Sequence, residues 1–347
     1  MIERNKQLAR HALLGLFTAS SIFAYSHTLG AGEFKNINSA NAPLPANIPT
    51  DLTVQSLNDQ LILEHDLYWK GFHVVTLETT INLEGRSYKT EMSWRTRGML
   101  SLFVDGKTTA QAMGEFDETM NIFVDKYLSQ GQWGDKEYIR EMAYDENGNP
   151  TIIQDINPWA NDDDDDEEVA ERRKKRRDKR RNSRRKTVVE RIPVPEDLKA
   201  NPDPISLALV TLLEPSRMIK STKLASSNDD IAPLTGREFH SYDGRRTLSY
   251  EIGCQGEVDK LKKSSRSPHY GESYACTVTG SPTGGYRKET VINTRTNEVI
   301  KTEGGEENTA QLWYLPTQDG TYMIPIRGNV EMEQGEISLY LKSANKQ

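Results

Sequence analysis

Cysteine is scarce in this chain of 347 residues, which contains only Cys254 and Cys276. A structural zinc site needs four ligands, and no cluster of histidines accompanies the two cysteines, so the sequence argues against such a site. An even cysteine count is still compatible with one disulfide if the protein works in an oxidising compartment.

Short catalytic motifs are also missing. The sequence has no Gly-x-Ser-x-Gly turn, no His-Glu-x-x-His pair and no glycine-rich phosphate loop ending in lysine. The histidines beyond the N-terminal region are His65, His73, His240 and His269. Because they are scattered, and Lys70-Gly71 reads as a turn between the first two, each is expected at the surface or in a hydrogen bond. We therefore expect no enzyme, no catalytic residue, no cofactor and no metal.

Long apolar runs are absent apart from residues 12–25. Basic residues precede this run and Gly30-Ala31-Gly32 follows it, which is the order of a secretory signal peptide. The run contains Thr and Ser and is shorter than the ~20 apolar residues of a spanning helix, which disfavours a membrane anchor. We expect residues 1–32 to be a cleaved leader, 33–56 a flexible lead-in, and the mature chain to reach the periplasm without a transmembrane segment.

Apolar residues recur at every second position through much of the remaining chain. Apolar and polar residues alternate in segments 75–83 and 88–94, which lie on either side of Gly85. They also alternate in segment 138–153, around Asn147-Gly148. This period, with glycine at the turns, predicts antiparallel hairpins. Further strands are expected at 100–104 and 110–116. Hydrophobic residues make up only 35% of the chain and charged residues 27%. This composition is typical of a sheet that buries one face and exposes the other to solvent.

The C-terminal part repeats the pattern. Apolar and polar residues alternate in segments 322–332 and 337–341, on either side of the turn Gln334-Gly335. Pro325 has no backbone donor, so we expect an edge or an irregularity there. The predicted fold class is mainly β: a strongly curved antiparallel sheet, a half-barrel or barrel-like meander, with one buried or capping helix.

The two cysteines fall on the apolar phase of neighbouring strands. The residues that share these phases are Leu248, Tyr250, Ile252 and Cys254 in one run and Tyr274, Cys276 and Val278 in the next. A disulfide between Cys254 and Cys276 is therefore the favoured interpretation, and two free buried thiols are the alternative.

One segment has a different pattern. Asp203-Pro204 precedes the apolar residues 205–213, and Pro215 follows them. These are the start and stop signals of a helix. Because the segment is apolar on nearly all sides, we expect it to be buried against the concave face of the sheet. A membrane-contacting helix is the alternative, although basic and aromatic anchors are missing.

Residues 159–190 form a charged insert. An acidic run at 162–168 is followed by a basic run at 172–186. The simplest interpretation is a disordered or exposed segment whose halves partly neutralise each other. The alternatives are divalent cations on the acidic run, and envelope lipid, anionic glycan or an envelope protein on the basic run; nucleic acid is disfavoured in this compartment. The candidate residues for an anionic surface are Arg172, Arg173, Lys174, Lys175, Arg176 and Arg177.

Taken in order, several segments resemble a family of exported bacterial proteins, domain of unknown function 3108. They are Tyr68-Trp69-Lys70-Gly71, Tyr88 to Gly98, Asp203-Pro204-Ile205-Ser206, Tyr242-Asp243-Gly244-Arg245-Arg246, Cys276, Ile324-Pro325-Ile326-Arg327 and Gly335-Glu336-Ile337. The resemblance implies a periplasmic protein with a curved sheet and no established activity. The charged insert departs from the family pattern.

These observations predict two β-rich halves, 57–158 and 217–343, separated by the insert and by a linker and helix at 191–216. The expected function is non-enzymatic and periplasmic, supporting the cell envelope. The alternatives are a periplasmic carrier for a lipid or other apolar ligand in the concave face of the sheet, and a hydrolase of unrecognised type.

Overall fold

The structure is a computed structural model that describes residues 58–102, 104–117, 121–158, 185–213, 237–305, 307–317, 322–331 and 335–347. The expected leader and lead-in lie outside the described residues, as do the candidate basic residues 172–177. In the described part of the chain, no helix is long and apolar enough to cross a bilayer.

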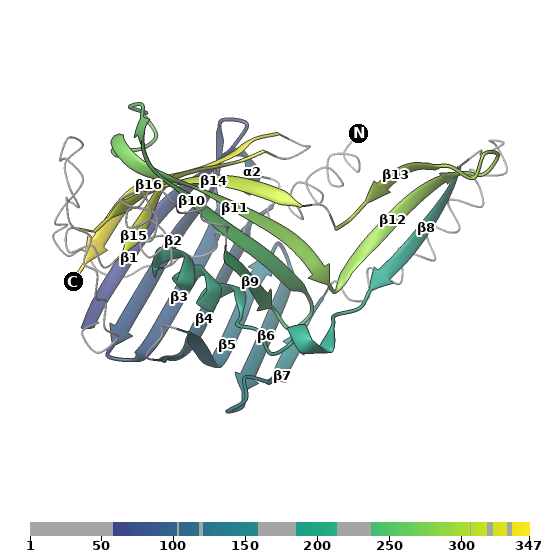
Figure 1. The fold of residues 1–347 in the computed structure, drawn as a ribbon, viewed down its shortest axis with the longest axis horizontal. Coiled ribbons are helices and arrows are strands. Elements are labelled where there is room, and N and C mark those ends of the chain that lie inside the picture. The colour runs from purple at the N-terminus through teal and green to yellow at the C-terminus, as the bar shows by residue number, and fades with distance from the viewer. Residues whose placement is uncertain are drawn as a thin grey trace, which may run out of the picture.

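A single antiparallel sheet of thirteen strands contains most of the described chain (Figure 1). Its order is β7-β6-β5-β4-β3-β2-β1-β16-β15-β14-β11-β10-β9. The strands are β1 (Asn58–Trp69), β2 (Phe72–Glu84), β3 (Ser87–Thr96), β4 (Gly106–Phe116), β5 (Ile122–Trp133), β6 (Lys136–Tyr144), β7 (Pro150–Ile156), β9 (Arg237–Tyr242), β10 (Thr247–Leu261), β11 (Gly271–Gly284), β14 (Asn308–Pro316), β15 (Met323–Val330) and β16 (Ile337–Lys346). This architecture confirms the predicted fold class.

The first seven strands form the predicted series of hairpins. In β2, Leu77, Ile81 and Leu83 are buried at alternate positions, because every second side chain faces the concave side of the sheet. Lys70 and Gly71 make the turn between β1 and β2 with φ angles of 48° and 86°. Positive φ at both central residues matches the right-handed twist of the flanking strands.

The two halves of the chain join where β1 pairs with β16. The antiparallel register runs from Leu61 opposite Lys346 to Trp69 opposite Ile337. The predicted halves therefore contribute to one continuous sheet with a shared core.

The sheet does not close into a barrel, because its edge strands β7 and β9 are not paired with each other. Side chains link the two edges instead. The Arg245 guanidinium lies 2.8 Å from the Asp155 carboxylate, and Arg140 donates a hydrogen bond of 2.9 Å to the Asp243 carbonyl. Arg140 also contacts Asp155 at 3.3 Å. We call Arg140, Asp155, Asp243 and Arg245 the seam cluster.

Two local predictions can be compared with the structure. The strand expected at 100–104 is wrong: a short helix, α2 (Gly98–Ser101), occupies part of this segment, and Leu102 is exposed. Gly98, with a φ of 55°, ends the extended backbone after β3. The irregularity predicted at Pro325 is confirmed: the β14–β15 register shifts at Tyr314, the partner of Pro325, and residues 323–326 have no ladder partner in β16.

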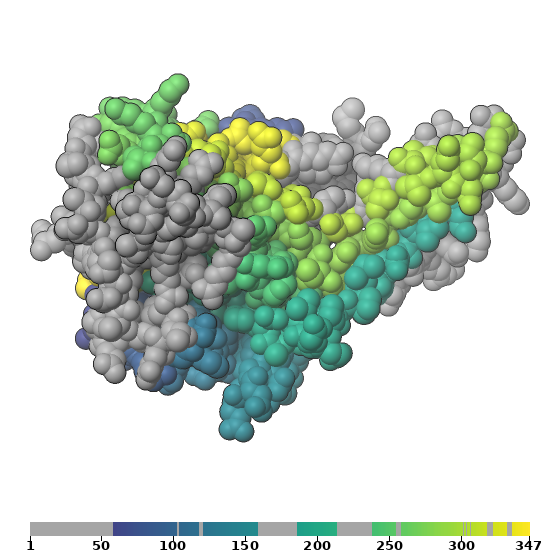
Figure 2. All heavy atoms as spheres, in the orientation of Figure 1, coloured from purple at the N-terminus to yellow at the C-terminus, as the bar shows by residue number. Residues whose placement is uncertain are grey.

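A separate three-stranded sheet projects from the barrel-like body (Figures 1 and 2). It consists of β13 (Val299–Glu303), β12 (Tyr286–Asn293) and β8 (Arg185–Ile192), in that order. We call it the arm. The last residues of the predicted insert, 185–190, belong to β8, so this part of the insert is a strand. The short 3-10 helix η2 (Glu196–Leu198) follows.

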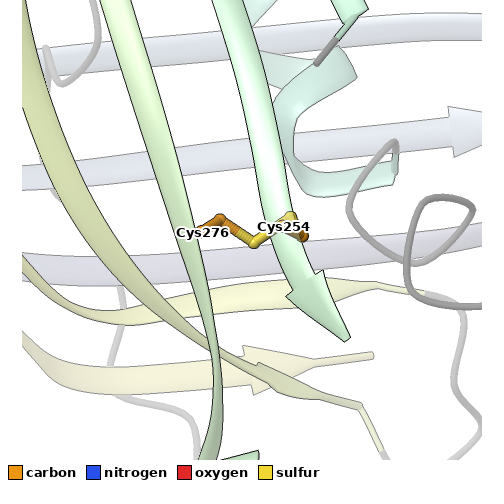
Figure 3. Close-up of a disulfide and its surroundings, with 2 residues drawn as sticks. All are labelled: Cys254 and Cys276. Atoms are coloured by element: carbon orange, nitrogen blue, oxygen red, sulfur yellow. A yellow bond between two sulfur atoms is a disulfide. The ribbon is translucent and has the colours of Figure 1, made fainter. Parts of the chain in front are cut away.

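The predicted disulfide is confirmed (Figure 3). Cys254 and Cys276 are direct cross-strand partners on β10 and β11, and both are buried. Immediately beyond this pair the register shifts, with three residues of β10 opposite one of β11 before Val258 meets Tyr274. The covalent link thus fixes the pairing of the two strands next to their main irregularity.

Reduction of this disulfide should lower the free energy of unfolding by about 3 kcal/mol, because it releases a loop in the unfolded chain. Urea unfolding with and without reductant measures the change. The double variant Cys254→Ala/Cys276→Ala is the control and should not respond to reductant. Equal midpoints for oxidised and reduced wild type would contradict this expectation.

The seam cluster should couple the two edges of the sheet. In a double-mutant cycle of Arg245→Ala and Asp155→Ala, we expect a coupling energy of about 1 kcal/mol, since the pair is partly exposed. Urea unfolding of the four proteins gives this value. If the changes in unfolding free energy of the two single variants add up to that of the double variant, the contact contributes nothing across the seam.

Candidate functional site

A helix comprising residues 204–213 lies inside the concave side of the sheet. Its apolar residues are buried around most of its circumference: Ile205, Leu207, Leu209, Leu212 and Leu213. A helix with several apolar faces is stable only if every such face is covered. This placement is the one predicted from its sequence.

Asp203 caps the helix at its N-terminus and is completely buried. Its carboxylate accepts the backbone N–H groups of Ile205 at 2.8 Å and Ser206 at 3.0 Å, and the Ser206 hydroxyl at 2.6 Å. Because that hydroxyl donates to Asp203, the Tyr88 hydroxyl, 2.8 Å away, must donate to Ser206. Burial raises the pKa of Asp203 to about 6, against the opposing effect of these hydrogen bonds. The network ties the helix to β3.

A cavity of about 40 Å³ lies between the helix and the sheet. Residues from β1, β2, β3, β14 and β15 and from the helix line it. They are Leu63, His65, Leu77, Thr79, Ile81, Thr90, Met92, Ala208, Leu209, Thr211, Leu212, Leu312, Tyr314 and Pro325. No lining residue is acidic, and His65 is the only one that can become positively charged, so the wall is apolar with a few neutral polar groups.

His65 is buried in this wall with a fixed tautomer. Its Nε2 lies 2.8 Å from the Pro325 carbonyl oxygen, which can only accept, so Nε2 carries the hydrogen. The ring can reach β15 because residues 323–326 of that strand have no ladder partner in β16. Burial lowers the pKa of His65 to about 4, and the hydrogen bond to Pro325 opposes only part of this shift. His65 is therefore neutral above pH 5, and its Nδ1 is an acceptor.

Three buried polar atoms in this wall have no hydrogen-bond partner among the described residues. They are His65 Nδ1, the Thr90 hydroxyl oxygen and the Tyr314 hydroxyl oxygen. Burial also raises the pKa of Tyr314, so its hydroxyl stays protonated. Leaving a buried polar group unpaired costs roughly 1–3 kcal/mol. The cavity thus offers one acceptor and two hydroxyls to any molecule that enters it.

The surroundings of His73 and His240 differ from those of a Ser-His-Asp triad. His73 Nε2 contacts both Asp66, at 3.0 Å, and Thr76, at 3.2 Å. A Ser-His-Asp type of site needs the carboxylate and the hydroxyl on opposite ring nitrogens. His240 lies 3.6 Å from an exposed glutamate. Among the residues that the structure describes, no group of three His, Cys, Asp or Glu side chains is placed to hold a metal ion.

In the sequence, His65 is one of several scattered histidines, and neither Thr90 nor Tyr314 belongs to a motif that predicts a site. The alternation of apolar and polar residues could have identified two of these positions. His65 shares the inward phase of Leu63 and Leu67, and Thr90 shares that of Tyr88 and Met92. A polar residue on the core phase of a strand is the feature that marks these positions.

Comparisons with known proteins give little further information. No family model matches the chain, and no curated protein matches it. A solved structure that resembles it is a β-barrel-like protein of domain of unknown function DUF1849 from Brucella abortus, with 10% sequence identity and a TM-score of 0.37. The likeness covers 84% of this chain and 98% of that chain. The predicted membership of domain of unknown function 3108 stays a prediction.

Replacing His65 should change the response of stability to acid. Its folded-state pKa lies below the ordinary value of 6.5, so its neutral form stabilises the fold fully above pH 6.5. This contribution is lost as the pH falls toward 4, by up to about 3 kcal/mol. His65→Gln can still donate to the Pro325 carbonyl but cannot ionise, so it should lack the loss. Urea unfolding from pH 7 to pH 4 measures the difference.

Asp203→Asn serves as the opposite control. The raised pKa of Asp203 favours folding as the pH falls from about 6 to 3.8, and the variant should lose this gain. Parallel pH profiles for wild type and His65→Gln would show that His65 does not titrate as its burial requires.

Proposed function

We propose that the protein is a non-enzymatic periplasmic binding protein, which supports the cell envelope by holding a neutral, largely apolar ligand inside its curved sheet. The observation that supports this proposal is the set of three unpartnered polar atoms in the wall of one apolar cavity. Ligand sites typically combine apolar walls with a few placed polar groups that fix orientation. What sets these three atoms apart from other buried polar atoms is that they meet in the wall of one cavity.

The chemistry of the wall indicates the class of ligand. His65 Nδ1 accepts a hydrogen bond, and the Thr90 and Tyr314 hydroxyls can donate or accept. Because the lining residues provide no carboxylate or permanent cation, an ionised ligand would enter without a counter-charge, which is strongly unfavourable. The best match is an apolar chain or ring that carries one hydroxyl or amide group.

The absence of catalysis is part of the proposal. Thr90 and Tyr314 have no hydrogen bond to His65, which is the only titratable base in the wall. A hydroxyl nucleophile requires an adjacent base to activate it. The wall therefore suits binding better than hydrolysis.

The periplasmic location rests on two features. The first is the order of basic, apolar and small residues in the first 32 positions, and the second is the disulfide in the core. Reducing cytosolic conditions would not maintain such a bond.

Binding a longer apolar ligand requires space that the helix now occupies. A cavity of about 40 Å³ holds only a few water molecules, at roughly 10–15 Å³ each. Leu209 and Leu212 line it from the helix side. We propose that the ligand displaces the part of the helix from Ala208 onward, while the Asp203 cap keeps the start of the helix in place.

Titration with a medium-chain alcohol, decanol, tests this function by calorimetry. We expect Thr90→Val and Tyr314→Phe each to weaken decanol binding about tenfold, the effect of one lost hydrogen bond. Both variants should unfold at equal or higher urea concentration than wild type, because each removes an unpaired buried polar atom. Decanoate and decylamine should bind much more weakly than decanol.

Thr80→Val is the matched control. Thr80 lies between Thr79 and Ile81 in β2, and its side chain faces the opposite side of the sheet from these two inward-facing residues. It should leave decanol binding unchanged. No saturable decanol binding to wild type, or equal binding by wild type, Thr90→Val and Tyr314→Phe, would overturn the proposal.

A further inference from the structure

The arm has no core of its own among the described residues. None of the side chains of β8, β12 and β13 belongs to the buried hydrophobic core. A small sheet normally needs an apolar face packed against another element. The arm nevertheless keeps a stable position, because its base is fixed to the barrel-like body.

The base of the arm is held by close backbone packing. Gly285 has a φ of 74°, and a side chain there would collide with the backbone of Arg245. Gly285 N–H also donates to the Ile192 carbonyl at 2.9 Å. A Cβ atom on Gly284 would lie 2.6 Å from Pro195. The arm is therefore a positioned projection of the body.

One face of the arm carries a row of apolar side chains. Cross-strand pairing places Ile192 beside Tyr286, and Ile292 beside Val299. Val188 has the same phase as Ile192 along β8, so it belongs to this face. Val188 and Val299 are 38% and 61% exposed. We call these five residues the arm face. Ile300, next to Val299, is also exposed, whereas the exposed Val189 lies on the opposite face of the arm.

Basic side chains border this aliphatic surface. Lys186 is the cross-strand neighbour of Ile292. Lys288 has the phase of the arm face on β12, where it lies opposite Glu190 of β8. Arg295 is exposed in the turn between β12 and β13. Over the three strands and this turn, residues 185–192 and 286–303 contain seven Lys or Arg and four Glu, a balance of +3. The whole chain carries −7, so the remainder carries −10.

We propose that the arm docks on the surface of a membrane rich in anionic lipid, with its tip toward the bilayer. Basic residues gain energy near anionic head groups, and exposed aliphatic side chains gain by entering the boundary between head groups and acyl chains. An anionic glycan would satisfy the basic residues only, and it would leave Val188, Val299 and Ile300 without a partner. The strongly acidic remainder is repelled by the same surface, which favours docking through the arm.

The geometry also provides continuity with the basic run. Twelve of the fifteen residues from 172 to 186 are Lys or Arg, and the last two, Arg185 and Lys186, begin β8. Arg185 pairs with Asn293 at the start of the β12–β13 turn, so the chain enters the arm at its distal end. The strand that begins there therefore follows directly on the most densely basic stretch of the sequence.

Vesicle flotation of the protein purified from the envelope tests this proposal. Wild type should float with vesicles of phosphatidylglycerol and phosphatidylethanolamine, but not with phosphatidylcholine vesicles, and its partition coefficient should fall with added salt. Lys186→Gln/Lys288→Gln/Arg295→Gln should lower the coefficient roughly 100-fold, at about fivefold per basic residue. Val299→Ser/Ile300→Ser should lower it at least tenfold.

Matched controls separate the arm from the rest of the surface. Lys89→Gln/Lys107→Gln removes exposed charge from β3 and β4, and Ile152→Ser/Ile153→Ser removes exposed aliphatic side chains from β7. Both should float like wild type. Unchanged thermal unfolding of the arm variants would show that they remain folded.

Three results would overturn the proposal. Wild type could fail to float with anionic vesicles, or the arm variants could float like wild type, which would assign binding to the basic run alone. Loss of binding in the charge variant with normal binding in Val299→Ser/Ile300→Ser would show that charge alone binds the head groups and that the aliphatic side chains do not enter the bilayer. Decanol titration is done without vesicles, so the two proposals can fail separately.

Discussion

The pairing of β1 with β16 is the interaction on which the rest of the structure depends. It joins the first described strand to the last, so that hairpins from both ends of the chain share one sheet. Without this ladder, both strands would become edges and the sheet would divide into two pieces. His65 illustrates the dependence. Its ring crosses to Pro325 beside this ladder, where β15 has separated from β16.

The second constraint follows from the open seam. A sheet of thirteen strands with a concave apolar side and two unpaired edges needs something to fill the hollow. The helix of residues 204–213 provides five buried aliphatic side chains, and the Asp203 cap satisfies its first backbone donors inside the core. The fit is incomplete on the side of β3 and β14. The unpaired atoms of Thr90 and Tyr314 are found at this position, in the wall of the cavity.

Much of this fold follows from local sequence patterns. The alternation of apolar residues and the glycine turns predicted the hairpins and the mainly β class, and the Asp203-Pro204 signal predicted a buried helix. The phase of Cys254 and Cys276 predicted their disulfide. These features depend on side-chain direction within a single strand or helix, which a sequence specifies directly.

The remaining features depend on contacts between distant segments. The strand expected at 100–104 did not form, because Gly98 ends the extended backbone. β8 pairs with β12 across almost a hundred residues, and its charged sequence resembles that of the insert before it. His65, Thr90 and Tyr314 come from three separate strands. Their convergence on one cavity is set by sheet curvature, which no local pattern encodes.

The seam cluster has a mechanical consequence. In a closed barrel, the backbone ladder runs around the whole circumference and fixes its girth. Here, among the described residues, the polar contacts of the seam cluster that span the two edges involve the side chains of Arg140 and Arg245. Such contacts can lengthen or exchange partners at a small energetic expense, whereas ladder hydrogen bonds cannot. The girth of the body is therefore held at the seam by side chains alone, while every other neighbouring pair of strands is held by its backbone ladder.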